Sequence, residues 1–169
     1  MRTIATDFGD FHCNGEEWVL DFLASLVYFG SFFGYISISL LADNFGRKTA
    51  LLISFGIATL GMILVGLAPN LVLVGVGLFL AGFGSDTAIN ICFYFVTETV
   101  GMEARQKHSV IIQFFFSLGG VVNVGYFYFF KNWRLIMWVF AIVPSLGCLV
   151  MVFLIVQETP FFLIKLKSV

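Results

Sequence analysis

The sequence predicts an all-α, polytopic membrane protein whose single domain, residues 1–169, contains five transmembrane helices. Composition and patterning support this fold class. Hydrophobic residues make up 60% of the chain and charged residues only 11%, with a mean hydropathy of +1.01. Soluble domains carry about 45–50% apolar and about 25% charged residues. The apolar residues also fall into five long runs. Such a chain has too little polar surface for water and needs lipid as its solvent.

Each of the five runs has close to the length that a helix needs to cross a bilayer, about 20 mainly apolar residues. In chain order, we predict spans at residues 18–42, 49–67, 71–96, 109–130 and 133–156. The second span ends at the turn signal Pro69-Asn70. The predicted connections are residues 43–48, 68–70, 97–108 and 131–132. Short connections make consecutive helices antiparallel neighbours.

The lysines and arginines predict how the bundle is oriented, because cytoplasmic loops carry an excess of them. One side of the membrane would hold Arg47, Lys48, Arg105, Lys107, Lys165 and Lys167. The other side would hold Arg2, Lys131 and Arg134. We therefore expect the first group in the cytosol or its equivalent.

Other classes of function receive no support from the residues. The net charge of −1 gives no basic field for nucleic acid. No Ser-His-Asp set, phosphate loop or carboxylate pair indicates an enzyme. The histidines, His12 and His108, belong to opposite ends of spans, so we expect no metal site and no cofactor. The first residues lack the features of a leader peptide. Plasma membrane and an organelle such as the mitochondrion, at its inner membrane, both remain open.

Small residues recur at four-residue spacing on two of the predicted spans. They are Gly30 and Gly34 on the first span, and Gly77 and Ala81 on the third. Helices in lipid gain little by hiding apolar surface from each other, so close backbone approach through small residues matters. We interpret these four positions as helix-packing contacts.

Asp86 and Asn90 are the candidate substrate-facing residues, because both lie well inside the third span. An ionisable group at this depth is costly unless it is paired or faces water. Asp86 has two readings. In the first, Asp86 is the counter-ion of a cationic substrate or of a basic residue on a partner subunit. In the second, Asp86 makes a local hydrogen bond to Ser85 or Thr87, and its carboxyl group lies near a cavity or is protonated. Asn90 suits a hydrogen bond to a neighbouring helix.

Four motifs, in one register along the chain, resemble those of a known family. Residues 42–48 (ADNFGRK) resemble the loop signature between helices two and three of the major facilitator superfamily, G-x-x-x-D-R-x-G-R-R/K. Residues 95–101 (FVTETVG) resemble the segment Y-x-x-x-T-E-x-x-G that closes helix four in organic cation and anion transporters. Residues 157–163 (QETPFFL) resemble their P-E-S-P-R-W-L, and residues 10–13 with Trp18 resemble the end of their extracellular loop.

The resemblance implies that the five spans correspond to helices two to six, in the N-terminal half of a twelve-helix carrier. It also implies a cytosolic charge cluster that latches the two halves. The matching positions are Asp43, Arg47, Lys48, Glu98, Arg105 and Glu158. Substrate passes between two six-helix halves in this superfamily. The chain alone would lack the opposing half and would not transport.

Four positions depart from the family pattern. Ser39 replaces a glycine, while Asn44, Leu78 and Phe161 stand where arginines are expected. Two hypotheses follow. The chain is either a partial or degenerate organic ion carrier completed by a second transporter half, or a transporter-derived, non-transporting accessory subunit among unrelated chains of a larger membrane complex. Its partners would be the lipid bilayer and other membrane chains. The methionine at position 1 favours a short protein.

Overall fold

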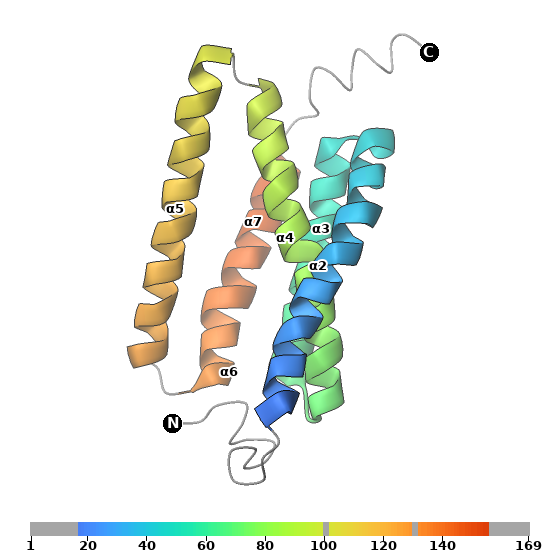
Figure 1. Cartoon of the computed structure of the whole chain (residues 1–169), viewed down its shortest axis with the longest axis vertical. Coiled ribbons are helices and arrows are strands. Elements are labelled where there is room, and N and C mark those ends of the chain that lie inside the picture. The colour runs from blue at the N-terminus through green and yellow to red at the C-terminus, as the bar shows by residue number, and fades with distance from the viewer. Residues whose placement is uncertain (1–16, 100–101, 130–131, 156–169) are drawn as a thin grey trace.

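The computed structural model describes residues 17–99, 102–129 and 132–155, which are almost entirely helical (Figure 1). The elements in chain order are α2 (Glu17–Phe45), α3 (Arg47–Leu67), α4 (Leu71–Thr99), α5 (Met102–Phe129), α6 (Trp133–Ile136), the π-helical segment η1 (Met137–Ile142) and α7 (Val143–Ile155). The last three follow one another directly and form one span. Within these residues, five spans are long and apolar enough to cross a membrane. The predicted fold class is therefore confirmed.

The helices run alternately up and down the bundle (Figure 1). The last turns of α2 and α4 and the first turns of α3 and α5 consequently lie at the same end, which we call the Arg47 end. α2, α3 and α4 pack closely together, and η1 and α7 pack on α3. α5 stands at the edge of the bundle and makes only sparse contacts with α4 and α6.

Glycines allow α2 and α4 to touch backbone to backbone. A Cβ on Gly30 would collide with the carbonyl oxygen of Phe79. A Cβ on Gly82 would collide in the same way with the carbonyl oxygen of Val27. Gly34 meets the backbone of α4 one turn further along. Close approach of this kind supplies the dispersion contacts that hold helices together in lipid.

On its other side, α4 packs against α3 through small residues. A Cβ on Gly77 would lie 2.7 Å from Cγ2 of Val65 and 2.8 Å from the carbonyl oxygen of Gly61. A Cβ on Gly61 would collide with the backbone nitrogen of Ala81. α4 is therefore the central helix of the compact part, with backbone contacts on two faces.

A single residue, Gly46, joins α2 to α3. Its backbone has φ 97° and ψ 156°, a region that is essentially restricted to glycine. The Gly46 N–H donates to the carbonyl of Ala42 at 3.2 Å, and the Ala50 N–H donates to the carbonyl of Gly46 at 3.2 Å. The backbone hydrogen bonds of both helices thus reach the joint from either side.

The connections at the Arg47 end are shorter than the sequence predicted. Where we expected a connection over residues 43–48, α2 continues to Phe45 and α3 begins at Arg47. Where we expected one over residues 97–108, α4 continues to Thr99 and α5 begins at Met102. The apolar runs indicated how much of each helix lies in lipid. Polar residues continue the helices beyond that depth.

The last span contains a π-helical turn that follows from Pro144. Proline has no N–H, and its ring clashes with the carbonyl four residues earlier, so an α-helix is interrupted there. The N–H of Val143 instead donates to the carbonyl of Trp138, five residues back. The wider turn packs against α3, where a Cβ on Gly66 would lie 3.4 Å from Nε1 of Trp138. Arg134 Nη2 donates to the carbonyl of Ala68 at 3.4 Å, just past the end of α3.

α5 differs from the other spans in how little of its described surface is covered by the rest of the bundle. None of the described side chains from Arg105 to Tyr126 is buried. A Cβ added to Gly119 or Gly120 would meet nothing within 4 Å. Much of its apolar surface is therefore available to lipid or to another helix.

Candidate functional site

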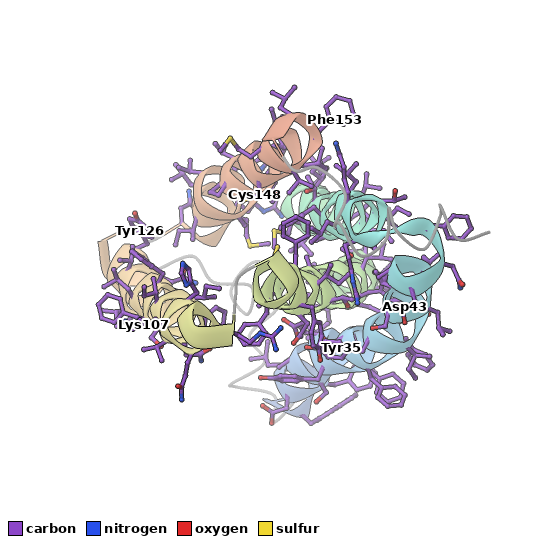
Figure 2. The ribbon with its side chains drawn as sticks, turned by 90° about the horizontal axis from the view of Figure 1, so that it is seen from above. Tyr35, Asp43, Lys107, Tyr126, Cys148 and Phe153 are labelled. Atoms are coloured by element: carbon purple, nitrogen blue, oxygen red, sulfur yellow. The ribbon has the colours of Figure 1, made fainter. Side chains whose placement is uncertain are left out.

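A line of polar residues runs along the contact between α2 and α4, and we call it the polar seam. Its residues on each helix follow one another at four-residue spacing, which keeps them on one face. α2 contributes Ser31, Tyr35, Ser39 and Asp43, and α4 contributes Asp86, Asn90 and Tyr94. Tyr35 and Asp43 are labelled in Figure 2. The seam extends from the middle of the bundle to its Arg47 end.

Asp86 is held by a residue of the facing helix. The Ser31 hydroxyl on α2 donates to Oδ2 of Asp86 at 2.6 Å, a length typical of a hydrogen bond to a carboxylate. Ser31 is buried, and Asp86 is half-buried. The sequence suggested a local partner, Ser85 or Thr87. Thr87 instead donates to the carbonyl of Phe83, on its own helix.

Asn90 joins the two helices one turn further along the seam. Its Nδ2 donates to the Tyr35 hydroxyl on α2 at 2.9 Å, and to the backbone carbonyl of Asp86 at 3.0 Å. The carbonyl bond fixes the side-chain amide relative to α4. The Tyr35 hydroxyl, having accepted this bond, keeps its own hydrogen for a further acceptor.

The seam opens into a pocket of about 530 Å³. Its lining residues come from α2, α4 and the first residue of α3. They are Tyr35, Ser39, Asp43, Arg47, Thr87, Asn90, Ile91 and Tyr94. Hydroxyl, amide, carboxylate and guanidinium groups therefore surround one space within an otherwise apolar bundle. A space with these groups accommodates water or a polar, charged ligand.

A second pocket, of about 290 Å³, lies on the other side of Asn90, between α4 and α5. It is mostly apolar, but it includes Gln113 of α5. Asn90 thus borders both spaces, one on each flank of α4. The opposite end of the α2–α4 pair has a different character, since its groove of about 320 Å³ is lined by apolar residues and Gly75.

The predicted charge cluster is only partly described by the structure. Asp43 Oδ1 and Arg47 Nη2 lie 3.6 Å apart across the Gly46 joint. Lys48 is half-buried, and Arg105 is exposed at the start of α5, at the same end of the bundle. Glu98 belongs to the last turn of α4. Glu158 lies outside the described residues.

Sequence reasoning singled out Asp86 and Asn90 but missed the residues that face them. Ser31 and Tyr35 on the facing helix were not candidates, and neither was Tyr94 further along α4, because single hydroxyl groups are common in membrane helices. Their spacing was a usable signal. Polar side chains recur every four residues from position 31 to position 43, in a span that is otherwise rich in phenylalanine.

Five apolar spans with a polar pocket between two of them define a polytopic membrane protein. Comparison with known proteins identifies its family. Residues 11–168 match the sugar (and other) transporter family. The chain belongs to this family, within the major facilitator superfamily.

Among its relatives are mammalian solute carriers. The chain is 33% identical over 150 residues to solute carrier family 22 member 2 of Mus musculus, a match that covers 89% of this chain and 27% of that protein. It is 34% identical over 167 residues to solute carrier family 22 member 3 of Rattus norvegicus, covering 98% and 29% respectively. These matches confirm the resemblance to organic ion transporters. The chain spans less than a third of the length of these relatives.

Proposed function

We propose that this chain forms part of one half of a solute carrier for organic ions, with the polar seam on its substrate-facing side. The observation that carries the proposal is the pocket between α2 and α4, with Asp86 held beside it. An acidic group inside a membrane span is retained at a cost and usually marks a path for a substrate or ion. The family membership and the solute carrier relatives support the same assignment.

We further infer that these helices do not transport by themselves. Alternating access in this superfamily requires one half to rock against another around a site between them. The described helices supply a single wall of such a site, formed by α2 and α4. Transport therefore depends on a facing half.

The test of this function is binding and uptake of a small organic cation, tetraethylammonium, with the full chain in lipid vesicles. We expect binding without uptake by the chain alone, and uptake after addition of the second half that co-purifies with it. Asp86→Asn should weaken binding about tenfold or more, since interactions with a charged group contribute about 1.5–3 kcal/mol. Asp21→Asn, at an exposed position near the start of α2, is the matched control.

Two outcomes would overturn the proposal. Binding that is equal in the wild-type chain and the Asp86→Asn variant would remove the seam from the substrate path. Co-purification with a complex of unrelated subunits, together with no binding of organic ions, would favour the accessory-subunit hypothesis instead.

A further inference from the structure

Asp86 is an acidic side chain inside a transmembrane helix without a basic partner among the described residues. The described lysines and arginines all lie near helix ends: Arg47, Lys48, Arg105, Lys107 and Arg134. A carboxylate at this depth must be compensated by a cation, by water or by a proton. No group of three metal-ligating side chains occurs in the described parts of the chain. The carboxyl group is therefore accommodated by the polar groups around it.

The Ser31 hydroxyl suits both states of this carboxyl group. A hydroxyl has one hydrogen to donate and two lone pairs that accept. With Asp86 ionised, Ser31 donates to Oδ2 across the observed 2.6 Å. With Asp86 protonated, the carboxylic acid donates to Ser31 Oγ over the same distance. The contact between α2 and α4 is thus preserved whichever group carries the hydrogen.

The hydrogen of Ser31 also has somewhere to go when Asp86 is protonated. Ser31 Oγ lies 2.9 Å from the carbonyl oxygen of Val27 and 3.2 Å from that of Gly82. Either oxygen can accept the hydroxyl hydrogen in addition to its helical bond, because a carbonyl has two lone pairs. Gly82 brings its carbonyl this near because α2 and α4 touch at that position. In both protonation states of Asp86, the buried Ser31 hydroxyl therefore has an acceptor for its hydrogen.

The groups that face Asp86 include few other charges. On α2, the Tyr35 phenol is close enough for electrostatic interaction with Asp86. On α4, Tyr94 lies two turns further toward the Arg47 end, where Asp43 and Arg47 form their ion pair. α3 and α5 present uncharged groups to this stretch of α4: Ser54, Ala58, Ile112, Gln113 and Phe116.

We propose that Asp86 and Ser31 together form a proton-binding site, which exchanges protons with water through the seam pocket at the Arg47 end. Asp86 is only half-buried, and the pocket is lined by its neighbours Thr87 and Asn90. One proton binds to one carboxylate, and Ser31 reverses its hydrogen bond as it does so.

Infrared difference spectroscopy of the full chain in lipid nanodiscs tests this site directly, without any organic ion. The pH is lowered stepwise, and the carbonyl stretch of protonated carboxyl groups is recorded. We expect one component that shifts in heavy water and disappears in Asp86→Asn. Asp21→Asn is the matched control, since Asp21 is exposed near the start of α2 and lies outside the seam, and it should leave that component in place.

The hydrogen bond is tested with a second pair of variants. Ser31→Ala removes the oxygen that accepts the hydrogen of protonated Asp86, so the Asp86 carbonyl band should move to higher frequency. Ser31→Thr keeps a hydroxyl at this position, so the band should stay at the wild-type frequency. These two Ser31 variants test whether Asp86 and Ser31 share the proton even if the Asp86→Asn variant fails to fold. The proposal is overturned if the spectra of wild type and Asp86→Asn agree, or if Ser31→Ala and Ser31→Thr give the same band. Because no substrate is present, these results are independent of the transport assay.

Discussion

The α2–α4 contact and α5 use glycine in opposite ways. On α2, a Cβ at Gly30 or Gly34 would collide with the backbone of α4. On α5, a Cβ at Gly119 or Gly120 would meet nothing within 4 Å. Both helices are apolar and both carry pairs of small residues. A small-residue pattern therefore marks where a helix is able to pack closely, and the neighbouring helix determines whether it does.

Polar groups show the same contrast. Along the α2–α4 contact, Ser31 bonds to Asp86 and Asn90 bonds to Tyr35 across the helix interface. On α5, Ser117 donates to the carbonyl of Gln113 within its own helix. In lipid, interhelical hydrogen bonds and dispersion contacts provide most of the association energy. The compact part has both, so its stability should respond to substitution far more than that of α5.

The largest effect is expected from the double substitution Gly30→Ala with Gly34→Ala. Each new methyl group meets the backbone of α4, which cannot move aside as a side chain does, so the helices must separate. Overpacking of this kind costs about 1–3 kcal/mol per site. The measurement is the Tm of the purified chain in mild detergent, followed by circular dichroism. A Tm equal to that of wild type would show that α2 and α4 are not in backbone contact.

The next largest effect is expected at the joint, from Gly46→Ala. The backbone at φ 97° disfavours any residue with a Cβ, and such strain costs about 1–3 kcal/mol. Gly56→Ala is a matched control in the neighbouring α3, since a Cβ there meets nothing within 4 Å. Thermal unfolding of both variants should show a lowered Tm for the first alone. Equal Tm values would contradict the strained joint.

A smaller loss is expected from Thr59→Val, which removes a hydrogen bond between α3 and α7. The Thr59 and Ser145 hydroxyl oxygens lie 3.2 Å apart, and valine has nearly the same shape as threonine. Hydrogen bonds between membrane helices contribute about 0.6 kcal/mol on average. Ser117→Ala on α5 is the comparison variant. If both changes lower the Tm equally, Ser117 contributes as much to helix packing as Thr59 does.

The smallest effect is expected from Gly119→Ala with Gly120→Ala on α5. No atom lies within 4 Å of the new methyl groups, and alanine is a better helix former than glycine. The Tm should stay the same or rise slightly. A clear loss in the chain reconstituted with its membrane partners, but not in the isolated chain, would reveal that another helix packs against this face.

The spans could be predicted from the sequence because a helix in lipid must be apolar over a fixed length. The ends of the helices could not, since nothing in hydropathy stops a helix where the lipid ends. α2 ends at Phe45 and α5 begins at Met102, and both residues lie in segments that the sequence predicts as connections. Pro144 was visible in the sequence, but a proline can end, kink or widen a helix, and the sequence does not show that a π turn forms here.

The candidate site could be predicted on one helix only. Asp86 and Asn90 stand out because of residue type and depth, which are properties of a single span. Their partners, Ser31 and Tyr35, are determined by how α2 crosses α4. That crossing depends on which glycines meet, and the sequence does not show which residue of one helix lies opposite which residue of the other.

The single-residue joint has a mechanical consequence for the bundle. A flexible linker lets two helices tilt independently, whereas Gly46 is held by backbone hydrogen bonds on both sides. α2 and α3 therefore form a helical hairpin whose one-residue connection couples the tilt of one helix to that of the other. A tilt of α2 that widens the pocket beside Tyr35 must swing the far tip of α3 as well. Because Arg134 is bonded to the backbone there, that swing would carry the start of the last span with it.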